Sequence, residues 1–184
     1  MTTGSRIDQT KAMHLLEKVT VERTIDAFRN DQKVKSLGLP WPVTLAEKIA
    51  LLCRPEVGKP IDYILSLSWS LHYVERAELL SLVRPVWCPP GCYYPWTLEQ
   101  MFAEYRAGRF MLPEPNTVLK LEADMRVQFR ESDFVLTAYR DLPYLPQGMR
   151  LEDGHNRVTA AWLAGVIPAM VKMYIGEAKL TARC

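Results

Sequence analysis

One short segment, Asp-Gly-His-Asn-Arg at residues 153–157, constrains the fold of this chain more than any other part of it. An apolar stretch at residues 149–151 precedes it, and the alanine-rich residues 158–164 follow it up to Gly165. Glycine adopts turn conformations readily and commonly ends a helix. The layout therefore predicts a strand, a tight turn and then a helix that Gly165 closes.

The start of such a helix is a natural place to bind an anion. Its first backbone N–H groups lack partners within the helix, and the helix dipole is positive there. Gly154 lets the backbone approach a ligand closely, and His155 and Arg157 bring side-chain donors to the same place. Asp153 can orient one of these donors or hold a metal ion. This chemistry indicates phosphate, such as that of a nucleotide.

A purely structural interpretation stays open beside it. Asp-Gly between apolar segments is also an ordinary turn signal. Asn156 can act only as a helix N-cap, and Arg157 can be a solvated residue of the first helical turn.

The segment from Met149 to Gly165, with the short apolar stretch 166–171 after it, resembles the signature of the ParB/sulfiredoxin-like superfamily. The match covers about residues 149–175 and is closest to the free-serine-kinase branch, whose turn reads Asp-Gly-His-x-Arg. The superfamily includes nucleotide-dependent small-molecule kinases, the sulfiredoxin repair enzyme and CTP-binding chromosome-partitioning proteins. The resemblance implies that the nucleotide phosphates contact Gly154, His155, Asn156 and Arg157.

The resemblance also implies a fold. We expect an α+β chain with a ParB/sulfiredoxin-like C-terminal region, residues 97–184, built on a small mixed sheet. A mainly helical N-terminal region, residues 1–96, precedes it. Sulfiredoxin carries a cysteine in the turn, whereas this chain has none between Cys92 and Cys184. Partitioning proteins usually continue into a helix-turn-helix domain, and residues 166–184 are too few for one.

The favoured function is a nucleotide-dependent phosphotransferase, a kinase of a small hydroxyl-bearing molecule that uses ATP or ADP with Mg²⁺. Phosphoryl transfer needs phosphate anchors, a metal ion and a group that orients the acceptor. Asp153 is the expected metal ligand, and Asp153 or His155 the expected base. Because strand neighbours point to opposite faces, we expect only one of Glu152 and Asp153 to face the site, and choose Asp153. Other carboxylates carry no distinguishing signal: Glu47, Glu56, Asp62 and Glu75.

Two other classes of function remain. The chain can be a non-catalytic, nucleotide-responsive ParB-like protein that contacts DNA or a protein partner. It can also be an adaptor protein that has the same fold but no catalytic activity. The formal net charge of +2 is too small to indicate nucleic acid by itself.

Composition places the 184-residue chain among ordinary globular proteins, with 48% hydrophobic and 24% charged residues. Its first residues lack the apolar core of a signal peptide, and no apolar run is long enough to span a membrane. The sequence-based expectation is a cytoplasmic protein without a membrane segment.

Hydrophobic patterns predict the elements in the first part of the chain. Residues 11–30 are predicted to be helical, and residues 45–53 form a second helix that begins with a Thr44–Glu47 capping box. Residues 62–83 are interpreted as one long helix or two shorter ones. His72 lies within them and is interpreted as a hydrogen-bonded core residue.

The remaining elements follow a change of composition. Residues 84–96 are rich in proline and aromatic residues and predict a rigid, non-helical segment; its Cys88 and Cys92 are interpreted as reduced thiols rather than a zinc site. Thr97 is expected to cap a helix over residues 98–107. Alternation of apolar and polar residues predicts a strand over 117–129, and residues 133–139 fit either helix or strand.

Overall fold

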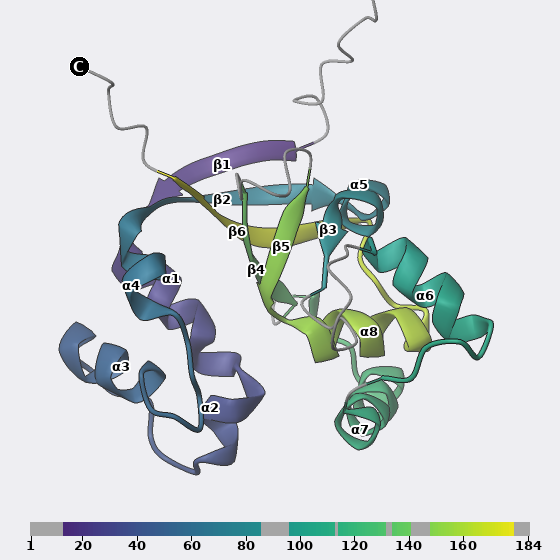
Figure 1. Ribbon diagram of the computed structural model, residues 1–184, viewed down its shortest axis with the longest axis horizontal. Coiled ribbons are helices and arrows are strands. Elements are labelled where there is room, and N and C mark those ends of the chain that lie inside the picture. Colours follow the sequence, from purple (N-terminus) through teal and green to yellow (C-terminus); the bar gives the residue numbers. More distant parts are fainter. Residues whose placement is uncertain (1–12, 86–95, 113, 132–133, 141–147, 179–184) are drawn as a thin grey trace, which may run out of the picture.

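A single mixed β-sheet organises the molecule (Figure 1). The computed structural model describes residues 13–85, 96–112, 114–131, 134–140 and 148–178. Within this part, the sheet has six strands in the order β1-β2-β6-β4-β5-β3. The strands are β1 (Met13–Val19), β2 (Leu67–Glu75), β3 (Val83–Arg84), β4 (Val135–Tyr139), β5 (Met149–Asp153) and β6 (Met170–Ala178).

The pairing mixes both directions. Antiparallel pairs are β1–β2, β2–β6 and β4–β5, and parallel pairs are β4–β6 and β3–β5. Strands from residues 1–96 and from residues 97–184 therefore join in one sheet. The described part of the chain also contains eight α-helices and one 3-10 helix, so the fold class is α+β, as predicted.

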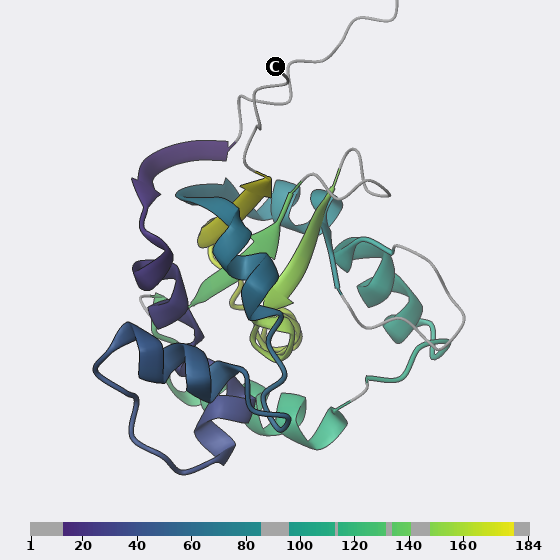
Figure 2. The same ribbon diagram turned by 60° about the vertical axis from the view of Figure 1, so that its left-hand side comes forward.

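Helices cover the sheet in two groups. A group from the N-terminal region contains α1 (Val21–Ala27), the 3-10 helix η2 (Phe28–Asn30), α2 (Gln32–Ser36), α3 (Leu45–Leu52) and α4 (Ile61–Ser66). The others are α5 (Arg76–Leu82), α6 (Leu98–Arg106), α7 (Pro115–Val127) and α8 (His155–Ala164). Figures 1 and 2 show α1–α4 gathered at one side of the molecule and α6–α8 at the other.

Each group encloses its own apolar core. One core includes Leu136, Ala138 and Met173 with residues of α6 and α8, and the other includes Trp69 and Tyr139 with residues of α1, α3 and α4. Successive residues of a strand point to opposite faces, so Ala138 and Tyr139 mark cores on opposite faces of the sheet. The site described below lies where residues of the α1–α4 group approach strand β5 and the start of α8.

Two predicted helices of the first half are wrong in part. Residues 13–19 form edge strand β1, and only from Val21 does a helix follow, with Thr20 accepting the hydrogen bond of its N-cap. Residues 67–75 form β2 between α4 and α5. β2 pairs with a strand on each side and is largely buried, and such strands show continuous apolar runs that resemble buried helices.

The predicted strand over 117–129 is also wrong, because this segment is helix α7. Pro115 stands in its first turn, where a missing N–H costs nothing. Three apolar residues of α7 belong to the core or pack against it at spacings of three and four residues: Val118, Leu121 and Met125. This is the period of a helix, and the sequence shows it at the same time as the two-residue alternation. Residues 135–139, left undecided by the sequence, form strand β4.

Several local predictions are confirmed. Thr44 and Glu47 form the capping box of α3, and Thr97 caps α6. His72 is buried, and its Nε2 lies 2.8 Å from Ser70 Oγ. Most of the proline-rich segment, with Cys88 and Cys92, lies outside the described residues, as does Cys184. Among the described residues, no helix is both long and apolar enough to cross a bilayer.

Candidate functional site

The predicted strand–turn–helix layout is present at residues 149–165. β5 ends at Asp153, Gly154 is the N-cap of α8, and Gly165 closes the helix with φ of +74°. Gly154 has φ of +102°, and a Cβ built on it would lie 2.3 Å from Leu136 Cδ2. Backbone conformation and close packing against β4 therefore both require glycine at the turn.

The N-terminus of α8 opens on a cavity of about 440 Å³ that residues 153–157 line. No side chain caps this helix, and its first turn contains no acidic residue. The first backbone N–H groups of a helix point out of its N-terminal end, and the N-cap Gly154 has no side chain that covers them. A helix end of this kind favours an anion.

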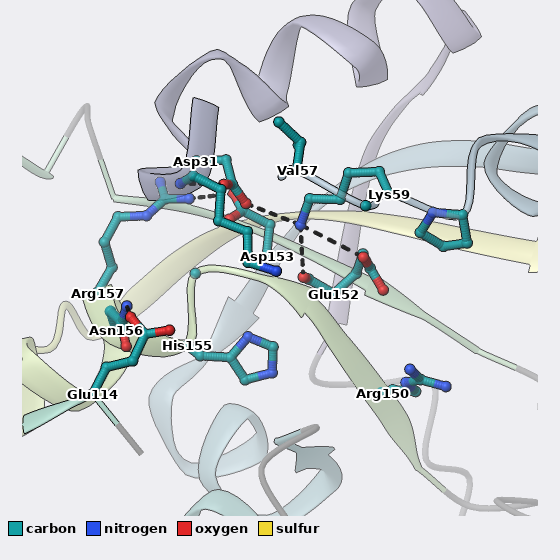
Figure 3. A pocket seen from close by; sticks show the side chains of 14 residues that line it. Asp31, Val57, Lys59, Glu114, Arg150, Glu152, Asp153, His155, Asn156 and Arg157 are labelled. Atoms are coloured by element: carbon teal, nitrogen blue, oxygen red, sulfur yellow. Dashed lines mark hydrogen bonds and ion pairs between the residues drawn. The ribbon is translucent and has the colours of Figure 1, made fainter. Parts of the chain in front are cut away.

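The opposite wall of the cavity comes from the N-terminal region (Figure 3). It includes Asp31, which is the N-cap of α2, and Lys59, which lies just before α4. The Lys59 ammonium lies 2.9 Å from Asp31 Oδ2 and 3.5 Å from Glu152 Oε1. All three side chains are at most 10% exposed, so Lys59 ties the N-terminal layer to strand β5 inside the protein.

Electrostatic interactions determine the protonation states of Lys59 and Asp31. Burial lowers the pKa of Lys59, but the carboxylates of Asp31, Asp153 and Glu152 outweigh burial and raise it. Burial is the largest influence and raises the pKa of Asp31, but the charge and hydrogen bond of Lys59, together with hydrogen bonds from Asp153 and the Lys33 backbone, leave this pKa below its usual value. Lys59 and Asp31 are therefore both charged at neutral pH.

Two neighbouring side chains change the pKa of Asp153 in opposite directions. Its carboxylate accepts a hydrogen bond from Arg157 Nη2, one helical turn away on α8, and the Asp31 carboxyl lies beside it. Burial is the largest influence, and together with Asp31 it outweighs Arg157 and raises the pKa of Asp153 to about 6. Asp153 thus exchanges a proton more easily near neutral pH than an ordinary aspartate.

Glu152 also lines the cavity, contrary to the expectation that only one of the two adjacent carboxylates faces the site. The reason is a bulge: β4 residues Thr137 and Ala138 pair with Asp153 and Leu151, which leaves Glu152 as the extra residue of β5. A bulge of this kind redirects side chains. Burial raises the pKa of Glu152, against the opposing charge of Lys59 and Arg150.

His155 lines the cavity and keeps some exposed surface. Burial, followed by the positive charges of Lys59 and Arg150, lowers its pKa to about 3. The ring is therefore neutral at physiological pH and is better placed to hydrogen-bond than to take up a proton.

The His155 ring gives a test of this electrostatic description. Because its folded-state pKa lies below the unfolded value, the unfolded chain binds the extra proton as pH falls from about 6.5 to 3, and stability is lost. We expect His155→Gln to lose less unfolding free energy than the unmodified protein over this range. Urea unfolding at pH 7 and pH 4 measures the difference, and an equal loss in both proteins would contradict a buried neutral ring.

Asn156, which the resemblance predicts to contact phosphate, has a structural contact in the protein. Its Nδ2 donates a 2.8 Å hydrogen bond to Glu114 Oε2 at the start of α7, while its buried Oδ1 has no hydrogen-bond partner among the residues that the structure describes. Both residues line the cavity. Asn156 thus links the turn to α7 at the wall of the cavity.

Sequence reasoning missed the residues that the N-terminal region contributes. None of the four upstream carboxylates considered above lines the cavity, although all lie in the described part of the chain: Glu47, Glu56, Asp62 and Glu75. Asp31, Lys59 and Arg150 do line it. A signal for Asp31 existed, because aspartate before a short helix is a favoured N-cap, but Lys59 lies in a loop that no local pattern distinguishes.

Within the described residues, no group of three metal-ligating side chains occurs. A Mg²⁺ ion does not require one, because it commonly uses one or two carboxylates together with water and substrate phosphates. Asp31 and Asp153 fit that requirement as a pair of adjacent carboxyl groups.

No protein-family model, curated protein or solved structure matches the chain. The ParB/sulfiredoxin-like arrangement stays a prediction from residues 149–175.

Proposed function

We propose that this protein is a nucleotide-dependent phosphotransferase that binds the phosphates of ATP or ADP at the N-terminus of α8 and acts on a small hydroxyl-bearing molecule. One observation supports it above the others. The uncapped start of α8 opens into a cavity of about 440 Å³ whose walls carry both basic and acidic side chains. The resemblance of the 149–175 segment to the ParB/sulfiredoxin-like superfamily agrees with it.

The basic side chains are the phosphate anchors. Arg157 and the first amides of α8 lie on one wall, and Lys59 reaches the cavity from the other. Arginine binds phosphate through two parallel N–H groups, and lysine acts as a point charge. The neutral His155 ring adds a hydrogen bond to the phosphates without adding charge.

The acidic side chains distinguish this cavity from a simple anion site. Four carboxylates line it beside the cations: Asp31, Glu114, Glu152 and Asp153. Phosphoryl transfer needs such a mixture, because the acceptor hydroxyl must lose a proton while the phosphates are held. We assign the base role to Glu152, since its pKa is raised by burial and Asp153 is held by Arg157.

Asp153 and Asp31 are the residues that would hold Mg²⁺, as the sequence predicts for Asp153. Two adjacent carboxyl groups repel each other and favour a shared proton or cation. The ion would offset negative charge on the phosphates, which is the main demand of this reaction.

The substitution Arg157→Ala tests the phosphate site. We expect ATP and ADP binding to weaken at least tenfold, because a charge-assisted hydrogen bond contributes about 1.5–3 kcal/mol. Arg109→Ala is the matched control, because Arg109 is 65% exposed, pairs with Glu104 and does not line the cavity. Titration calorimetry measures both variants, and equal affinity of Arg157→Ala and the unmodified protein would contradict the site.

A thermal-shift screen with ATP, ADP and CTP, with and without Mg²⁺, separates the classes of function. A nucleotide present at 100 times its Kd raises the unfolding free energy by about 2.7 kcal/mol. Stabilisation together with phosphate transfer to an added hydroxyl compound supports the kinase. Stabilisation by CTP without transfer favours the ParB-like binding protein, and no stabilisation by any nucleotide favours the adaptor.

A further inference from the structure

We propose that the Glu114 carboxylate binds the ribose hydroxyls of the nucleotide and makes the cavity selective for ribose over sugars that lack these hydroxyls. This inference rests on the proposed function, since it requires the nucleotide phosphates to bind at the start of α8. Of the four carboxylates that line the cavity, Glu114 is the one to which phosphoryl transfer assigns no role.

Glu114 lies at the wall of the cavity, next to the turn that begins α8. It is the exposed N-cap residue of α7, and its side chain makes no capping hydrogen bond to that helix. Asn156 Nδ2 donates a 2.8 Å hydrogen bond to Glu114 Oε2, which holds the carboxylate beside the turn (Figure 3). This bond uses one of the roughly four acceptor positions of a carboxylate, so a ligand can donate to the others.

Within the described part of the chain, Glu114 forms no ion pair. The other cavity carboxylates, Asp31, Glu152 and Asp153, each contact a lysine or an arginine. Because like charges repel, a carboxylate without a cation weakens the binding of a nearby phosphate unless the ligand also donates a hydrogen bond to it. Ionised phosphate oxygens only accept hydrogen bonds, whereas hydroxyl groups donate them. Glu114 therefore fits a hydroxyl-bearing part of the ligand.

The direction of phosphoryl transfer places the nucleoside on the Glu114 side of the cavity. The attacking and leaving oxygens lie roughly in line, on opposite sides of the transferred phosphoryl group. The attacking hydroxyl must lie at Glu152, the proposed base, which stands beside Lys59. Figure 3 shows Glu152 and Lys59 on one side of the start of α8, and Glu114 with Asn156 on the other. The leaving nucleotide therefore extends toward Glu114.

The ribose carries the donors that suit this carboxylate. Its 2′ and 3′ hydroxyls are adjacent, so one carboxylate can accept a hydrogen bond from each of them. Only C5′ separates the sugar ring from the α-phosphate, so the ribose begins where the phosphate site ends. Carboxylates bind ribose hydroxyls in other nucleotide sites. A 2′,3′-dideoxyribose lacks both donors and would leave the negative charge of Glu114 beside the phosphates without compensation.

The experiment is calorimetric titration of the full chain with ADP and with 2′,3′-dideoxyADP, in EDTA and again with Mg²⁺. We expect the unmodified protein to bind ADP about tenfold more tightly or better, because a hydrogen bond to a charged group changes a Kd by roughly that factor or more. Glu114→Ala should bind the two nucleotides with similar affinity under both conditions. The loss should fall on ADP alone, because dideoxyADP has no hydroxyl to donate to Glu114.

Glu99→Ala is the matched control, because Glu99 is also an exposed glutamate at the start of a helix, α6, and does not line the cavity. It should retain the full preference for ADP. Equal affinity of the unmodified protein for both nucleotides, or a preference that Glu114→Ala retains, would overturn this inference and leave the proposed function standing. An effect of Glu114→Ala that appears only with Mg²⁺ would also overturn it, since Glu114 would then act on the metal ion. Absence of ADP binding under every condition would overturn both.

Discussion

Lys59→Met is expected to destabilise the protein by about 3–5 kcal/mol, the cost of leaving a buried charge without its partner. The Lys59 side chain is 8% exposed, and the carboxylates it contacts, Asp31 and Glu152, are 9% and 10% exposed. Methionine fills a similar volume but leaves these carboxylates facing each other. Equilibrium unfolding in urea at pH 7.5 measures the loss.

Lys48→Met is the matched control. The Lys48 side chain is also 8% exposed, but its partners Asp26 and Glu22 are 45% and 55% exposed and remain hydrated without it. We expect this variant to lose at most about 1 kcal/mol from the ion pairs. The Lys59→Met loss should also shrink at pH 5, where Asp153 is protonated. Equal losses for the two lysine variants would contradict a buried charge group at the centre of the site.

Gly154→Ala is expected to destabilise the protein by about 2–5 kcal/mol. About 1–2 kcal/mol comes from placing a side chain at φ of +102°. A further 1–3 kcal/mol, roughly, comes from overpacking, because the new Cβ would lie 2.3 Å from Leu136 Cδ2. Thermal and urea unfolding measure the sum.

Gly165→Ala separates the two contributions. Gly165 also has a positive φ, of +74°, but in the described part of the chain no atom apart from its own chain neighbours lies within 4 Å of the added Cβ. It should lose only the backbone contribution of about 1–2 kcal/mol. Shortening Leu136 in the Gly154→Ala protein should cost less than the two single changes together, because the clash is removed. Additive losses would show that Leu136 does not restrict the turn.

Local signals in the sequence predicted the strand, turn and helix of residues 149–165 well. The turn at 153–157 combines a glycine that the backbone requires with a helix start and a helix-closing Gly165, and all three depend on neighbours within a few residues. The capping boxes of α3 and α6 are local in the same sense. Such features need no knowledge of the rest of the chain.

Strand pairing and long-range contacts could not be predicted in this way. β2 is a strand because β1 and β6 lie on its two sides, and those partners come from opposite ends of the chain. Lys59 reaches Glu152 across 93 positions of sequence, and Asp31 joins the site only because the N-terminal layer packs on the sheet. Glu152 faces the cavity because of a bulge that the strand pattern does not reveal.

The central claim is that the backbone amides at the start of α8 bind nucleotide phosphate. The most direct test is an NMR titration of the ¹⁵N-labelled protein with ATP, following the amide signals of His155, Asn156 and Arg157. We expect these signals to shift together and to saturate at the Kd that calorimetry gives. Signals that stay in place while ATP is added, or that move only at positions away from the cavity, would contradict the proposed site.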